Sequence, residues 1–129
     1  MLIEFRKRIK NQKGFTLVEL MVVIAIIGVL SAIAVPKLAS STESAKIAKI
    51  QADLRTIGGA AAIYYSQNGS FPADTATLVA ANLLAANPIV PADATGYTIS
   101  QTTGVAECTY KGNIYKSDGS TAKVPPATP

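Results

Sequence analysis

The chain has 129 residues, of which 49% are hydrophobic, and a formal net charge of +4. One cysteine and no histidine exclude an intramolecular disulfide and argue against a metal site of the Cys/His kind. The charge is concentrated in residues 1–13, because the remainder of the chain has as many acids as bases. The residues that remain after residues 1–13 and the apolar run behind them are enough for one small soluble domain.

The basic head, Met1–Lys13, carries five Lys or Arg residues and a single acid. Positive charge beside an apolar segment favours the cytoplasmic side of a membrane. A basic arm for nucleic acid is the alternative, but no further basic patch extends this one, so no direct nucleic-acid site is evident.

An apolar run, Phe15–Val35, follows the head, and Glu19 is its only charged residue. As a helix it would be about 31 Å long, which matches the hydrocarbon core of a bilayer. A carboxylate inside such a segment is costly, so we expect Glu19 to have a function. A carboxylate that snorkels to the membrane surface is the alternative.

Two helix-weakening residues, Gly28 and Pro36, lie in and just after this run. Both predict local flexibility, either as a tolerated kink or as a segment that straightens or melts during assembly. A secretory signal peptide is a rival interpretation, because the segment Ser31-Ala32-Ile33-Ala34 could be mistaken for its small-residue cleavage site. The helical pattern continues beyond them, which argues against it.

Apolar residues then recur at steps of three and four, which predicts one buried helix face. Its members are Ile47, Ile50, Leu54, Ile57, Ala61 and Tyr64. We predict one long helix over Phe15–Gln67, ended by Asn68-Gly69.

The remaining residues predict a short helix over Thr75–Leu84 and three β-strands joined by turns. The strands are Tyr97–Gln101, Glu107–Lys111 and Asn113–Lys116. The fold class is therefore α+β, with a long N-terminal α-helix packed on a small antiparallel β-sheet. The polar, proline-rich segment Ser117–Pro129 is expected to be frayed.

Cys108 is best interpreted as a small buried residue, with a reactive or intermolecular thiol as the alternative. The scattered acids Asp93, Glu107 and Asp118 give only a weak signal for calcium. No nucleophile–base pair or phosphate-binding loop is present, so no enzyme activity, metal or cofactor is predicted.

The segment Lys13-Gly14-Phe15-Thr16-Leu17-Val18-Glu19-Leu20, continued by Met21–Lys37, resembles the type IV pilin superfamily. This superfamily includes pilus subunits and the pseudopilins of type II secretion. The resemblance implies a pilin-like fold with three parts. They are a cytoplasmic leader peptide (1–14), a transmembrane and assembly helix (15–36) and a soluble globular domain (37–129).

The resemblance also implies site residues. A prepilin peptidase would cut between Gly14 and Phe15 and methylate the new amine of Phe15. Glu19 would face the N-terminal amine of a neighbouring subunit, and Thr16 would assist that contact through its hydroxyl.

The function implied is that of a structural subunit of a type IV pilus, used for motility, adhesion or DNA uptake. The alternatives are the major pseudopilin of a type II secretion system and, in a different class, a secreted or membrane-anchored binding domain. Expected partners are identical subunits, the prepilin peptidase, the inner-membrane assembly machinery and, before assembly, membrane lipid. The precursor is expected to cross the cytoplasmic membrane once, with its C-terminal domain outside, and to become a surface or periplasmic filament.

Overall fold

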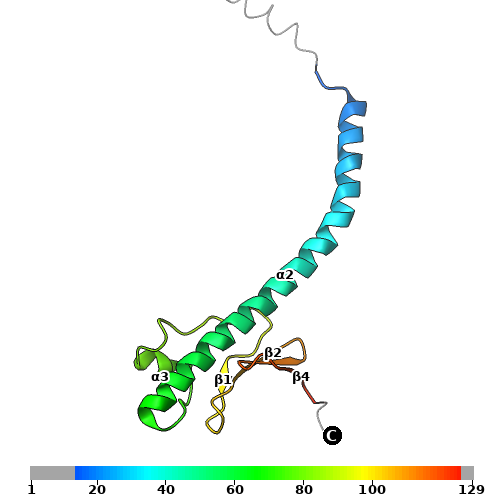
Figure 1. The fold of residues 1–129 in the computed structure, drawn as a ribbon. Helices are drawn as coiled ribbons and strands as arrows, with labels where there is room; N and C mark the ends of the chain where they lie inside the picture. The colour runs from blue at the N-terminus through cyan, green and yellow to red at the C-terminus, as the bar shows by residue number, and fades with distance from the viewer. Residues whose placement is uncertain (1–13, 126–129) are drawn as a thin grey trace, which may run out of the picture. The chain divides into compact units, whose positions relative to one another are not determined.

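A computed structural model describes residues 14–125, so residues 1–13 of the predicted leader lie outside the described residues. The chain divides into two compact units, Met1–Ser41 and Thr42–Pro129. Figure 1 shows the order of the elements along the chain. The helix α2, Leu17–Asn68, begins in the first unit and continues into the second.

Helix α2 has 52 residues and confirms the predicted long helix to within two residues at each end. The helix is uninterrupted at Gly28 and at Pro36, so neither residue breaks it. Just after the proline, the hydroxyls of Ser40 and Ser41 both donate to the carbonyl of Lys37, at 2.9 and 3.0 Å. The predicted flexibility of this region stays a prediction.

The second unit is built around one face of α2. The buried residues of the helix are Ile50, Leu54, Ile57, Ala60 and Ala61. Ile47 and Tyr64 pack partly against them, so every member of the predicted apolar face contributes to the core. Burying an aliphatic side chain such as Leu54 contributes about 1.5–3 kcal/mol, which makes this face the main attachment of the helix to the domain.

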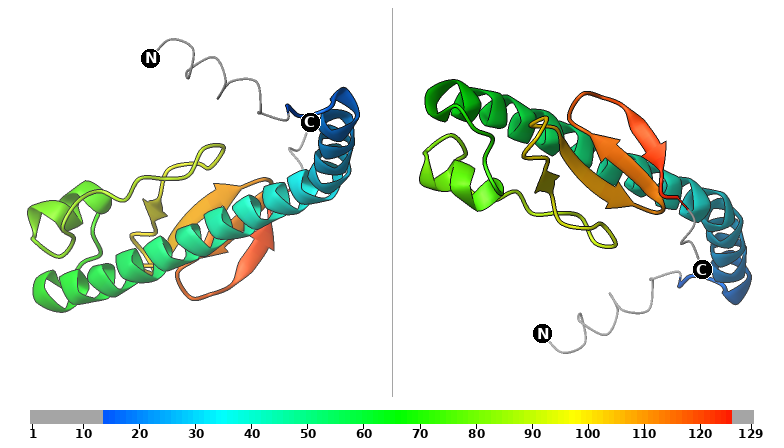
Figure 2. Two further views of the ribbon diagram at one scale, coloured as in Figure 1. Left: turned by 90° about the horizontal axis from the view of Figure 1, so that it is seen from above. Right: turned by 90° about the horizontal axis from the view of Figure 1, so that it is seen from below.

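A four-stranded antiparallel sheet covers this face, as the two views of Figure 2 show. Its strands follow in chain order as β1 (Thr98–Ile99), β2 (Ala106–Tyr110), β3 (Asn113–Lys116) and β4 (Thr121–Lys123). In β2 the buried residues alternate, because successive side chains of a strand point to opposite faces. The α+β fold class and the antiparallel meander are thus confirmed.

The C-terminal segment corrects a prediction, because part of the segment expected to be frayed forms β4. A tight turn precedes this strand: Gly119 has φ +87°, and the Asp118 carboxylate accepts the Ser120 N–H at 2.8 Å. The three side chains of β4 are exposed, so backbone pairing with β3 rather than apolar patterning holds it. Residues 126–129 lie outside the described residues.

Two further elements are shorter than predicted. Helix α3 covers only Thr75–Ala80, and Asn82 then adopts a left-handed conformation with φ +56°. Its residue Leu78 is fully buried. The first strand is limited to two residues because the chain turns at Gly104, whose N–H donates to the Ser100 carbonyl at 2.8 Å.

The long connection before the sheet is attached to α2 by a polar cluster. The ammonium of Lys49 donates to the Asp53 carboxylate at 2.6 Å and to the Ile89 carbonyl at 2.7 Å. The Tyr97 hydroxyl donates to the same carboxylate oxygen of Asp53 at 2.6 Å. Burial and the nearby Asp53 carboxylate raise the pKa of Tyr97, so this phenol stays protonated and keeps donating.

Candidate functional site

The N-terminus of α2 is closed by a reciprocal contact between Thr16 and Glu19. The Glu19 Oε2 accepts hydrogen bonds from the backbone N–H of Thr16 at 2.8 Å and from its hydroxyl at 2.7 Å. In return, the Glu19 N–H donates to the Thr16 hydroxyl oxygen at 3.2 Å. This geometry is a capping box, in which two free N–H groups of a helix start are satisfied together.

The capping box gives Glu19 a role within its own chain. Unpaired backbone N–H groups are costly in an apolar medium, and a negative charge near a helix N-terminus is favourable. Glu19 was expected to face a second subunit or, alternatively, to snorkel to the membrane surface, and this contact within the chain was not predicted. The spacing Thr-x-x-Glu ahead of an apolar run was the available signal.

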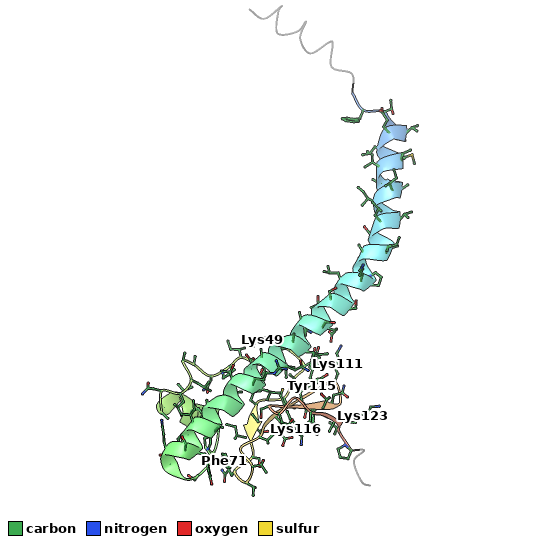
Figure 3. All side chains as sticks on the ribbon, in the orientation of Figure 1. Lys49, Phe71, Lys111, Tyr115, Lys116 and Lys123 are labelled. Atoms are coloured by element: carbon green, nitrogen blue, oxygen red, sulfur yellow. The ribbon has the colours of Figure 1, made fainter. Side chains whose placement is uncertain are left out.

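The helix beyond the capping box has an apolar surface with nothing packed on it. Every residue from 14 to 42 is exposed, including Leu17 at 72% and Leu30 at 61%. Figure 3 shows these side chains projecting around the helix. A shallow groove in this surface passes Glu19 and is otherwise lined by apolar residues: Phe15, Val18, Leu20, Val22 and Val23.

By length and composition, α2 is the one helix among residues 14–125 that is able to cross a membrane. Its most apolar window is 0% buried within the chain, unlike the core helix of a soluble protein. This segment therefore requires lipid or other protein around it.

The residues at the predicted cleavage point are accessible. Phe15 is 93% exposed, and Gly14 precedes the first turn of the helix. A Cβ added to Gly14 would meet no described atom within 4 Å, so packing within this part of the chain does not require a glycine there. A requirement for Gly14 is therefore not explained by packing among residues 14–125.

The other residues considered from the sequence have structural surroundings. Cys108 is 2% exposed and its Sγ donates to the Thr95 carbonyl at 3.1 Å, which confirms a buried thiol. Burial raises the pKa of this thiol, which lowers its reactivity. Within residues 14–125 no group of three acidic, Cys or His side chains is arranged to hold a metal ion.

Comparison with known proteins places the N-terminal segment in context. Residues 9–35 match the family model described as the prokaryotic N-terminal methylation motif. Type II secretion system core protein G of Pseudomonas aeruginosa is 38% identical over 63 residues, 49% of this chain and 44% of that protein. Type IV major pilin protein PilE of Neisseria gonorrhoeae is 45% identical over 65 residues, 49% of this chain and 38% of that protein.

A longer match extends beyond α2. Type II secretion system core protein G of Klebsiella michiganensis is 36% identical over 90 residues, 70% of this chain and 61% of that protein. In each of these comparisons the match spans less than two thirds of the relative's own length.

Three features define a membrane-anchored protein of the pilin class. They are the exposed apolar part of α2, the methylation motif at its start and the small α+β globular unit. The N-terminal segment of the chain is similar to those of a type IV pilin and of type II secretion core proteins G, which supports a place in the type IV pilin superfamily. The relatives include a type IV major pilin, a fimbrial protein and type II secretion core proteins G.

Proposed function

We propose that the chain is a structural subunit of a type IV pilus that is cleaved by a prepilin peptidase and polymerises through its N-terminal helix. The observation that carries this proposal is the exposed apolar surface of α2. This surface follows a helix N-terminus that is closed by the capping box and preceded by an accessible Phe15. In the monomer only lipid can cover such a surface. In a filament the same side chains pack on the helices of identical subunits.

Assembly then follows from the geometry of a repeated contact. A head-to-tail contact that does not close on itself generates a helical filament. The partners are identical subunits, the peptidase and an inner-membrane machine that extracts each subunit from lipid. The role is structural rather than enzymatic, and no cofactor is involved.

Glu19 would give the assembly its register. Cleavage before Phe15 creates a new amine, a cation that requires a counter-charge in a water-poor filament core. The capping box engages one carboxylate oxygen of Glu19, Oε2. Glu19 therefore caps its own helix and neutralises the Phe15 amine of a neighbour, with Thr16 aligning the carboxylate.

The proposed function divides the chain into three parts. Residues 1–14 are removed as a cytoplasmic leader, 15–36 form the membrane and assembly segment, and 37–129 form the globular domain outside the membrane. Gly28 and Pro36 provide flexibility when a subunit leaves the bilayer.

The mass of the N-terminal peptide from cells tests this proposal. Methylated Phe15 is the expected terminus, and Gly14→Val should leave an unprocessed precursor in the membrane. Gly28→Val is the matched control, since an added Cβ meets no described atom within 4 Å at either glycine, and it should be processed normally. A chain that begins after Ala34 would instead identify a secreted binding domain, and uncut protein a membrane-anchored one.

The major pseudopilin of a type II secretion system is the second candidate. The observation that favours it is the 90-residue match to a core protein G, which reaches beyond α2 into the globular domain. Deletion of the gene in its own host separates the two functions. Loss of sheared surface filaments with normal secretion supports the pilus, whereas retention of folded exoproteins in the periplasm supports the pseudopilus.

A further inference from the structure

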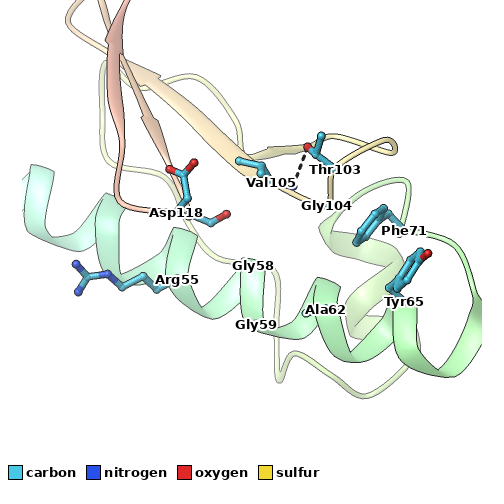
Figure 4. A pocket seen from close by; sticks show the side chains of 11 residues that line it. Arg55, Gly58, Gly59, Ala62, Tyr65, Phe71, Thr103, Gly104, Val105 and Asp118 are labelled. Carbon is cyan, nitrogen blue, oxygen red and sulfur yellow. Dashed lines mark hydrogen bonds between the residues drawn. The ribbon is translucent and has the colours of Figure 1, made fainter.

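A pocket of about 460 Å³ lies in the globular unit between α2 and two turns of the sheet (Figure 4). Gly58, Gly59 and Ala62 of α2 form part of its wall. Arg55 and Asp118 lie at one end of the pocket, and the rings of Tyr65 and Phe71 lie at the other. These two rings are stacked with their centroids 4.4 Å apart, which gives that end a rigid apolar wall.

The two glycines of this wall differ in what surrounds them. A Cβ at Gly58 would lie 2.7 Å from the Ser117 side chain, so packing within the subunit explains that glycine. A Cβ at Gly59 would meet no described atom within 4 Å. Glycine inside a helix is destabilising relative to alanine, so Gly59 lowers the stability of α2. The contacts described within the subunit do not explain why a glycine stands there. A glycine of this kind is used where another group approaches the backbone closely.

A complementary apolar projection lies elsewhere on the same unit. Ile89 is 82% exposed, more than any other large hydrophobic residue described in the globular unit. Pro88 and Pro91 flank it and restrict its backbone. The hydrogen bond of 2.7 Å from Lys49 to the Ile89 carbonyl fixes this loop on α2. The side chain is therefore held outward on a restrained support.

The projection and the pocket lie on opposite flanks of α2. With about 100° of rotation per residue, Lys49 and Asp53 lie on one side of the buried row Ile50–Leu54–Ile57, and Gly58 and Ala62 lie on the other. A single subunit therefore cannot close this contact with itself. A contact between two different patches is heterologous and propagates from copy to copy.

Two exposed residues beside the two patches, one basic and one acidic, have opposite charges. Arg55, at the pocket, and Asp93, four residues after Ile89, are both exposed. Neither forms an ion pair with another residue of the part of the chain that is described. An acid beside the projection and a base beside the pocket favour one relative orientation of two copies.

We propose that Ile89 of one subunit inserts over Gly59 into the pocket of a neighbouring copy, with Asp93 of the first facing Arg55 of the second. This inference rests on the proposed filament and specifies a contact between globular domains. It adds a second contact to the one made by the apolar part of α2.

Disulfide trapping in filaments sheared from cells tests this contact. The double variant Ile89→Cys with Ala62→Cys should give a ladder of covalent multimers on oxidation, because Ala62 lines the pocket. Each single variant is a control, and buried Cys108 is retained. Ile89→Cys with Ala76→Cys, an exposed residue of α3 outside the pocket lining, is the matched control and should give no ladder.

Filling the pocket is an independent test. Gly59→Leu should reduce filament yield about tenfold, the change expected when a central contact is lost. Ala52→Leu makes a similar change at an exposed position of α2 outside the pocket and should leave the yield unchanged. Arg55→Glu and Asp93→Lys should each reduce the yield, and their combination should restore it.

The outcomes separate this contact from the proposed function. Failure of the unsubstituted chain to form filaments would overturn the function and the contact together. Filaments that form normally with Gly59→Leu and show no ladder with the cysteine pair would overturn only the contact.

Discussion

Tyr110 donates a hydrogen bond of 2.6 Å to Oε2 of Glu43, although 67 positions separate the two residues. The ammonium of Lys111 lies 2.7 Å from the same oxygen, and that of Lys46 lies 3.5 Å from Oε1. These contacts join the first turn of α2 in the globular unit to the β2–β3 hairpin. They fix the hairpin at the position where the helix enters the domain.

This cluster predicts a pH dependence of stability. The hydrogen bonds from Lys111 and Tyr110 lower the pKa of Glu43 from an ordinary 4.5 to about 2. Because the folded pKa is lower, the unfolded chain binds more protons between these values, so stability falls with decreasing pH. The contribution is complete above about pH 4.5 and is lost as the pH falls toward 2. Thermal melts of the detergent-solubilised chain across this range measure it.

Glu43→Gln is the matched variant for this experiment, because it keeps the shape of the side chain and removes the charge. It should lower the melting temperature at pH 7, and its melting temperature should fall less between pH 4.5 and 2 than that of the unsubstituted chain. The half-buried carboxylate of Glu107, whose ion pair with Lys116 is 3.8 Å long, provides the control. A decline as steep in Glu43→Gln as in the unsubstituted chain would contradict the assignment to Glu43.

A second prediction concerns the core. Leu54 is 0% exposed, so Leu54→Ala should reduce the free energy of unfolding by about 2–5 kcal/mol through lost burial and a residual cavity. Ile89→Ala, at a site 82% exposed, should change it by less than about 0.5 kcal/mol. Urea titration of the detergent-solubilised chain, followed by circular dichroism, compares the two. Equal effects would mean that the α2 face is not the main stabilising contact.

Local patterns in the sequence were sufficient for some parts of this fold and insufficient for others. The three- and four-residue spacing from Ile47 to Tyr64 predicted the buried face of α2, because a long periodic pattern depends only on neighbouring residues. Strand β4 was missed because its three side chains are exposed, and its partner β3 rather than its composition defines it. The contact between Glu43 and Tyr110 has no local signal at all.

The candidate functional site was also predicted only in part from local patterns. Gly14, Phe15 and Glu19 stood out because their motif is local and a charge in an apolar run is conspicuous. The capping box was equally local but was not predicted, since Glu19 had been considered as a partner for a second subunit or as a snorkelling carboxylate. The pocket beside Gly59 combines residues 55–62 with turns near 104 and 118, which no spacing rule brings together.

A third prediction uses two glycines with left-handed backbones. Gly104 has φ +70°, and a Cβ there would lie 2.2 Å from the Phe71 ring. Gly112 has φ +75° with no described atom within 4 Å of an added Cβ. Gly112→Ala should therefore cost only the backbone strain, about 1–2 kcal/mol, whereas Gly104→Ala should cost more because the ring must move. Urea titration of the detergent-solubilised variants measures the difference, and equal losses would show that the Phe71 contact is unimportant.

The fourth prediction separates the two roles of Glu19. Glutamine at this position keeps the capping box but carries no charge, whereas alanine removes both. Both variants should be processed to a Phe15 terminus, and only Glu19→Ala should weaken the first turn of the helix. If the charge pairs with the Phe15 amine of a neighbour, both should lose filaments, by about tenfold or more. Sheared filament yield, measured beside the amount of processed monomer, decides between the roles. A normal yield for Glu19→Gln with a reduced yield for Glu19→Ala would mean that Glu19 acts as a helix cap and not as an ion-pair partner.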